Sequence, residues 1–205
     1  SKDVTLHIKS PLQKFSGTVL GGLRFTSAPS HIKAKNEPAV KANIAYSIAV
    51  VLKESDQVIA PEMHLLGVKP EIRNYRNYIS AQLQNSAPRL IKKLEADARV
   101  YKKGTNSLLY QAKKSEMKMA PNSNFKFGIN LENHSLKPGQ YTLKVSGKAD
   151  GKPYYFKRDF TISAKQAKKN NINAVYATDS HSPSSSLLII LIMGIVLIIL
   201  IIGYF

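Results

Sequence analysis

The side chains best suited to chemistry in this 205-residue sequence are its histidines and carboxylates, and their spacing assembles no site. The five histidines fall in five different segments, at His7, His31, His64, His134 and His181. None stands at a metal-ligand spacing from another histidine, aspartate or glutamate. The sequence has no cysteine, which excludes disulfides, thiol catalysis and cysteine-based zinc sites. We therefore expect neither a metal site nor thiol chemistry.

Local catalytic motifs are absent as well. The sequence has no GxSxG elbow, no Walker loop and no glycine-rich turn between a strand and a helix. Gly21 and Gly22 lie inside an alternating run, where glycines more often mark a β-bulge or a close backbone approach than a phosphate cradle. We predict that the protein is not an enzyme, with no catalytic, cofactor-binding or metal residues and no cofactor. The sequence assigns no binding residues.

Charge is the strongest signal in the composition. The sequence has 30 Lys and Arg against 13 Asp and Glu, a formal net charge of +17. Such a surface attracts polyanions, namely nucleic acid, anionic lipid headgroups or the phosphate polymers of a bacterial wall. The alternative is a solvated surface with no specific partner. Basic and aromatic residues mix at 75–78 and 154–158, but on alternating strands half of these rings point inward, so we predict no nucleic-acid binding.

Apolar and polar residues alternate with a period of two through most of the chain, a pattern typical of antiparallel strands with one buried face. Expected strands cover residues 18–26, 43–54, 63–68, 78–84, 94–100, 107–113, 125–132, 141–146 and 154–163. Residues 43–54 are apolar on both faces and are expected to lie centrally in a sheet. Residues 90–98 also fit one face of an amphipathic helix, but the cleaner alternation from Leu94 favours a strand.

Turn-forming residues separate these runs. Asp150-Gly151 lies between two alternating runs and predicts a β-hairpin, and Lys69-Pro70 predicts a turn. Strands at this spacing, without interleaved helices, predict an all-β fold: an immunoglobulin-like antiparallel β-sandwich over residues 10–164. We expect residues 1–9 to be a remnant strand of an upstream domain.

The last segment, residues 187–205, is apolar and uncharged. In helical geometry it rises by roughly 28 Å, about the thickness of a bilayer's hydrocarbon core. We therefore predict one C-terminal transmembrane helix in the lipid bilayer, preceded at 165–186 by a short helix and a flexible spacer. The nearest basic residue before the span is Lys169, so the charge rule does not decide on which side of the membrane the domain lies.

Four stretches, residues 15–25, 119–125, 136–143 and 167–176, together carry a resemblance. In this order they resemble the C-terminal host-binding domain of the WxL-interacting cell-surface proteins of Gram-positive bacteria, over roughly residues 10–176 plus the span. We interpret the matched residues as structural. Residues 120–123 form a turn whose Asn and Ser can bond neighbouring backbone, and the loop at 136–140 delivers Tyr141 to the core.

The resemblance implies an architecture and a location. Members of the family have a secretion signal, an N-terminal peptidoglycan-binding domain, this domain and one membrane span, and they form wall-associated complexes with WxL proteins and contact host matrix components. Three features depart from the pattern: only residues 3–9 could belong to a peptidoglycan-binding domain, Tyr154 stands where Trp is frequent, and no basic residues follow the span.

We therefore expect a membrane-anchored, single-pass module whose N-terminal domain is extracellular. Its expected partners are WxL-domain surface proteins, a host extracellular matrix protein and anionic cell-wall polymers. The alternative is a cytosol-facing, tail-anchored protein whose basic domain binds polyanions.

Overall fold

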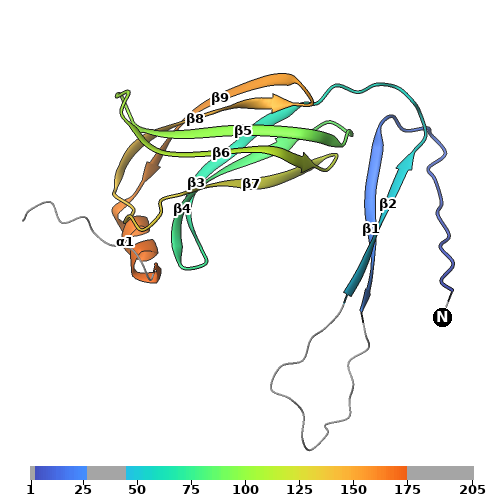
Figure 1. Cartoon of the computed structure of the whole chain (residues 1–205), viewed down its shortest axis with the longest axis horizontal. Helices are drawn as coiled ribbons and strands as arrows, with labels where there is room; N and C mark the ends of the chain where they lie inside the picture. The colour runs from blue at the N-terminus through green and yellow to red at the C-terminus, as the bar shows by residue number, and fades with distance from the viewer. Residues whose placement is uncertain (1–2, 27–44, 175–205) are drawn as a thin grey trace, which may run out of the picture.

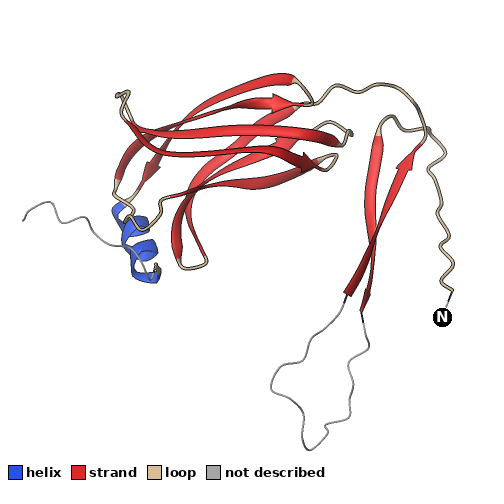
Figure 2. Cartoon of the chain, in the orientation of Figure 1, coloured by secondary structure: helices blue, strands red, loops and turns tan. Residues whose placement is uncertain are grey.

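The computed structural model describes residues 3–26 and 45–174, which form nine strands and one helix (Figure 1, Figure 2). These elements are β1 Thr18–Thr26, β2 Ala45–Lys53, β3 Met63–Arg73, β4 Arg76–Asn85, β5 Ile91–Lys102, β6 Leu108–Met119, β7 Ser123–Asn130, β8 Gly139–Ala149, β9 Lys152–Ile162 and α1 Ala164–Asn173. Strands β1 and β2 form a separate two-stranded sheet, which stands apart from the body made by the other strands in Figure 1.

The body is a sandwich of two antiparallel sheets, with strand orders β3-β4-β7 and β6-β5-β8-β9. Alternate positions of these strands supply the core, as sheets with one buried face require. The core includes the buried side chains Ile79, Leu83, Ala98, Val100, Phe127, Ile129, Leu143 and Val145. The predicted all-β fold with a β-sandwich is confirmed. The strand expected at 94–100 is also confirmed, against its helical alternative.

Two connections between strands have local structures that fit their residue types. Ala149 pairs with Lys152 across a two-residue loop in which Asp150 and Gly151 have φ values of 47° and 86°. Positive φ at both positions is typical of the type I′ turn, which matches the twist of hairpin strands. In the loop that leads from one sheet to the other, the Tyr141 hydroxyl donates a 2.7 Å hydrogen bond to the Lys137 carbonyl and ties that loop to the start of β8.

Helix α1 follows the last strand, and the short helix expected here is confirmed. Ser163 caps its N-terminus, because the Ser163 hydroxyl accepts a 3.2 Å hydrogen bond from the Gln166 N–H. Asn171 fastens the helix to the loop before β8. Its side chain accepts from the Leu136 N–H at 2.9 Å and donates to the Leu136 carbonyl at 3.0 Å.

The position of residues 43–54 differs from the prediction. In the described chain β2 pairs only with β1, so it is not a central strand, and Tyr46 is 70% exposed. A run that is apolar on both faces indicates that a strand can be covered on both sides, but not which element covers it. The bulge considered for Gly21-Gly22 is absent, because the β1–β2 register is continuous.

Lys69-Pro70 is not a turn but lies inside β3. Proline is tolerated there because β3 is an edge strand of its sheet, and one of its sides has no backbone hydrogen-bond ladder that proline could interrupt.

Residues 3–9, expected as a remnant strand, pair with no strand of the described chain and are exposed.

Within residues 3–26 and 45–174, no helix is long and apolar enough to cross a membrane. The predicted span at 187–205 lies outside the described residues, as does most of the predicted spacer.

Candidate interaction surfaces

The histidines do not gather into a site. His64 Nε2 lies 2.9 Å from the Ser86 hydroxyl, and His134 Nδ1 lies 3.0 Å from the Leu131 carbonyl oxygen. Among the residues that the structure describes, no three histidine, aspartate or glutamate side chains come together as a group that could hold a metal ion. His31 and His181 lie outside the described residues. The candidate sites are therefore surfaces.

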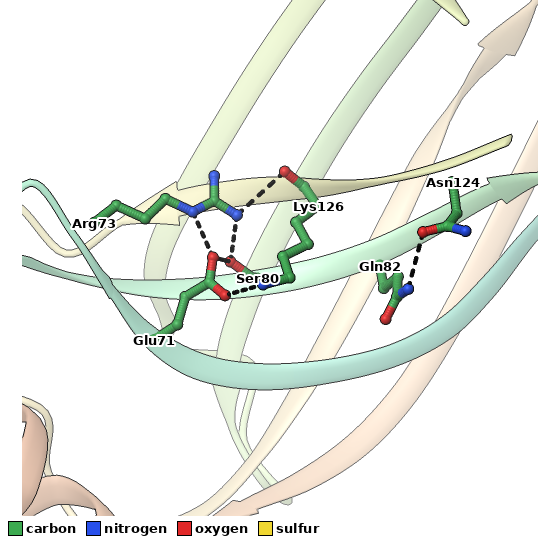
Figure 3. Close-up of polar contacts among 6 residues, drawn as sticks. All are labelled: Glu71, Arg73, Ser80, Gln82, Asn124 and Lys126. Atoms are coloured by element: carbon green, nitrogen blue, oxygen red, sulfur yellow. Dashed lines mark hydrogen bonds and ion pairs between the residues drawn. The ribbon is translucent and has the colours of Figure 1, made fainter. Parts of the chain in front are cut away.

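The first surface is the outer face of the β3-β4-β7 sheet, which carries a polar network (Figure 3). At its centre the Glu71 carboxylate accepts hydrogen bonds from the Arg73 guanidinium, from the Ser80 hydroxyl at 2.6 Å and from Lys126 Nζ at 2.9 Å. Arg73 also donates to the Ser80 hydroxyl at 2.7 Å and to the Lys126 carbonyl at 3.2 Å. The network crosses all three strands and holds two cations on one carboxylate.

The polar groups of this network are directed at one another. The Arg73 guanidinium lies 5.4 Å from the centre of the Tyr78 ring, a cation–π distance. Beside the network, Gln82 donates a 3.0 Å hydrogen bond to Asn124. The adjacent pocket has a volume of about 110 Å³, which is small for an organic ligand. We interpret this surface as a device that stabilises the sheet.

The network makes stability depend on pH. Burial acts to raise the pKa of Glu71, but hydrogen bonds from Lys126, Ser80 and Arg73, with the Arg73 charge, lower it to about 2 from the usual 4.5. Because the pKa is lower in the folded state, the carboxylate contributes stability that is present above pH 4.5 and is lost as pH falls towards 2. We expect Glu71→Gln to reduce the free energy of unfolding by roughly 2 kcal/mol near neutral pH.

Urea unfolding of the parent and the variant at about pH 7 and about pH 3 measures this effect. The difference in the free energy of unfolding between the two proteins should be smaller at the lower pH. Glu95→Gln, which alters an exposed carboxylate outside the network, is the control and should change stability little at either pH. If the difference in the free energy of unfolding between the parent and Glu71→Gln is the same at both pH values, the prediction is wrong.

The second surface is one face of the β1–β2 hairpin. The register places Val19 opposite Leu52, Gly21 opposite Val50, Leu23 opposite Ile48 and Phe25 opposite Tyr46. Alternate residues of a strand share a face, and no polar residue interrupts this one. We call these eight residues, Val19, Gly21, Leu23, Phe25, Tyr46, Ile48, Val50 and Leu52, the apolar hairpin face. Four of its large side chains, Val19, Phe25, Tyr46 and Ile48, are exposed, with Tyr46 at 70% and Ile48 at 56%, whereas Leu23, Val50 and Leu52 are half-buried.

This exposure is unusual for a soluble domain. A two-stranded hairpin is at best marginally stable alone in water, and contiguous exposed apolar surface marks interaction sites. The other face of the hairpin is mixed, because Leu20 and Val51 alternate along it with polar pairs such as Arg24 and Ser47. Sequence reasoning missed the apolar hairpin face because it interpreted the same residues as core.

The base of the hairpin is fastened to the sandwich. The Thr18 N–H donates a 2.7 Å hydrogen bond to the Pro88 carbonyl. Arg89 donates to the Ile59 carbonyl at 2.7 Å and pairs with Asp150 at 3.0 Å. Burial acts to raise the pKa of Asp150, but hydrogen bonds from two backbone N–H groups of β5 and from Arg89 lower it, so the carboxylate stays charged. The hairpin that carries the apolar hairpin face is therefore attached to the sandwich at its base.

Comparison with known families decides the class of this protein. The family described as WxL Interacting Protein, host binding domain, matches residues 35–172 of the chain. The chain belongs to this family. The match covers β2, the sandwich and nearly all of α1, and it confirms the resemblance found from the four stretches. None of the curated proteins matches the chain.

Three of the stretches that carry this resemblance, 119–125, 136–143 and 167–176, contribute to the fold of the host binding domain. In the turn before β7 the Ser123 hydroxyl donates a 2.7 Å hydrogen bond to the Ala120 carbonyl, as the sequence predicts. Tyr141 is buried in the core, and Asn171 fastens α1. As a WxL-interacting host binding domain the chain has a role in protein interaction at the cell surface. Of the described surfaces, the apolar hairpin face suits that role best.

Proposed function

We propose that this chain is a non-enzymatic module on the outside of a Gram-positive bacterium, and that it binds WxL-type surface proteins through the apolar hairpin face. The observation that carries the proposal is the exposure of this face on a hairpin that the sandwich anchors but does not cover. Membership of the WxL-interacting family supports the class of partner. A host extracellular matrix protein is a further partner in this proposal.

Binding combines two known modes of recognition. In the described chain each strand of the hairpin pairs only with the other, so each leaves one edge of backbone N–H and C=O groups for a partner's strand. The apolar face then supplies aromatic and aliphatic anchors, the side chains that dominate binding energy at protein interfaces. Gly21 leaves open space in the middle of this face, with no atom within 4 Å of the position of an added Cβ, and a partner side chain can enter there.

We assign the sandwich to the immunoglobulin type. In constant-type immunoglobulin domains one sheet holds strands A, B, E and D and the other holds C, F and G. In chain order, β3-β4-β7 correspond to A, B and E and β5-β8-β9 to C, F and G, whereas β6 pairs with β5 instead of joining the other sheet. Tyr141 near the start of β8, bonded back to Lys137, has the position of the tyrosine corner of such folds.

In this proposal residues 187–205 are the membrane anchor, and the residues between α1 and the anchor space the domain from the bilayer. The competing arrangement is a tail-anchored protein with its basic domain in the cytosol. The family supports the outward arrangement, because a WxL-interacting protein outside the cell meets surface partners directly.

One experiment tests partner and orientation together. The full chain is produced in a Gram-positive bacterium, the wall is removed, and a purified, fluorescently labelled WxL-domain protein is added to intact and to lysed cells. We expect saturable binding to intact cells that cells without the chain do not show. Binding only after lysis would overturn the outward orientation, and binding to neither preparation would overturn the partner.

A further inference from the structure

The outer face of the β6-β5-β8-β9 sheet carries a row of cations in register. Arg99 on β5 pairs with Lys144 on β8, and Lys144 pairs with Lys157 on β9. Because neighbouring strands lie about 4.8 Å apart, these three cations form a line across three adjacent strands. Like charges directly opposite one another destabilise a sheet. The row therefore costs folding stability, and such costs are expected at functional sites.

More cations lie beside this row. In the strand register Lys113 lies opposite Asp97 and Lys148 lies opposite Glu95, on the same face of the sheet. A groove of about 290 Å³ is lined by these four residues and also by Ser115, Ser146 and Lys114. Hydroxyl and ammonium groups together are donors that phosphate oxygens accept from readily. We call Arg99, Lys113, Lys144, Lys148 and Lys157 the cationic strip.

Two acids of this face, Asp97 and Asp159, are already engaged, whereas the Glu95 carboxylate is exposed. Asp97 accepts hydrogen bonds from Arg99 at 2.7 Å and from Gln111 at 2.9 Å. Asp159 accepts from the Thr142 hydroxyl at 2.7 Å and pairs with Lys103 at 3.2 Å.

The lysines of the strip are available by contrast. Lys148 and Lys157 are exposed, and neither they nor Lys144 form an ion pair within the part of the chain that the structure describes. Lys144 instead lies 4.7 Å above the centre of the Tyr101 ring, which holds its ammonium group on this face. Three ammonium groups therefore remain for an external anion.

We infer that the cationic strip binds a linear polymer of phosphate groups without bases. The strip spans several strands on an open sheet face, so it matches an extended polyanion better than a single small anion. Binding of single-stranded nucleic acid uses several exposed aromatic rings on which successive bases stack. Next to the row, Tyr155 is 59% exposed, whereas Tyr101 is covered by Lys144, so this face offers one free ring and not a series.

The test measures binding of the full chain, in non-ionic detergent, to immobilised linear inorganic polyphosphate over a range of salt concentrations. The variant Lys144→Gln/Lys148→Gln/Lys157→Gln should lose about tenfold or more in affinity, and its slope of log K against log salt should fall by about 2, for three lost phosphate contacts. The matched control, Lys165→Gln/Lys168→Gln/Lys169→Gln, removes the same charge from exposed positions of α1 and should change affinity by less than about twofold.

Equal losses in the two triple variants would overturn the inference, because net charge alone would then explain binding. The double variant Lys148→Gln/Lys157→Gln keeps the half-buried Lys144 in place, and its affinity loss should be intermediate if the triple variant proves poorly folded.

Oligothymidylate with the same number of phosphates should compete more weakly than polyphosphate. Equal or stronger competition by oligothymidylate, or by glycerol phosphate at the same phosphate concentration, would overturn the assignment to a base-free polymer. Since the strip and the apolar hairpin face share no residue, this result is independent of WxL binding.

Discussion

Replacing Tyr46 and Ile48 together by serine is expected to weaken binding of a WxL-domain protein by roughly 100-fold or more. Both side chains lie on the apolar hairpin face, where they are 70% and 56% exposed in the free chain. Burial of a large apolar side chain at an interface contributes about 1.5–3 kcal/mol, and about 1.4 kcal/mol corresponds to a tenfold change in affinity. Because the two side chains are exposed before binding, their loss should change the free energy of unfolding by less than about 0.5 kcal/mol each.

The matched control lies on the same two strands. Leu20 and Val51 are opposite each other on the mixed face of the hairpin and are 41% and 58% exposed. The double variant Leu20→Ser/Val51→Ser removes a similar amount of apolar surface and should leave affinity within about threefold of the parent. Surface plasmon resonance with immobilised WxL-domain protein gives both affinities. If the two double variants lose affinity equally, the apolar hairpin face is not the selective contact, and if neither does, the partner binds the sandwich instead.

The largest expected effect on stability is at Gly147, and we expect Gly147→Ala to lower the free energy of unfolding by about 3 kcal/mol. A Cβ at this position would lie 1.9 Å from the Glu95 carbonyl oxygen and 2.7 Å from the Tyr154 hydroxyl. Both atoms are held in place, because the Tyr154 hydroxyl donates a 2.7 Å hydrogen bond to the Glu95 carbonyl. Room for the methyl group requires a shift of β5 away from β8 and loss of that hydrogen bond.

The control for this variant is Gly21→Ala, at another glycine within a strand. No atom lies within 4 Å of an added Cβ there, so we expect a change of less than about 0.5 kcal/mol, or slight stabilisation through a less flexible unfolded chain. Urea unfolding followed by far-ultraviolet circular dichroism gives both values. A loss below about 1 kcal/mol for Gly147→Ala would mean that β5 and β8 separate easily at this position.

The three surfaces have different roles and lie on different parts of the molecule. The network around Glu71 satisfies its own polar groups and stabilises one sheet. The cationic strip lies on the other sheet, and the apolar hairpin face lies outside the sandwich. Since Arg89 joins Ile59 to Asp150 at the base of the hairpin, the sandwich provides the fixed point from which the hairpin is presented.

Much of the local structure could be predicted from the sequence. Alternation predicts strands that the structure contains, such as residues 94–100 within β5, and Asp150-Gly151 predicts the turn that joins β8 to β9. The short helix after the last strand is also expected, and the ordered stretches predict the family. These features depend on neighbouring residues, whose backbone preferences and side-chain hydrogen bonds act over a few positions.

Only the tertiary structure decided what each strand lies against. The run at 43–54 has the apolar pattern of a central strand, yet β2 pairs with β1 alone and presents that pattern to solvent. Pro70, which predicts a turn, is accommodated because β3 is at an edge. The row formed by Arg99, Lys144 and Lys157 comes from three strands whose alignment no short pattern encodes. Periodicity determines which side chains share a face, whereas pairing between distant segments determines what covers that face. The candidate binding surfaces arise from this pairing between distant segments.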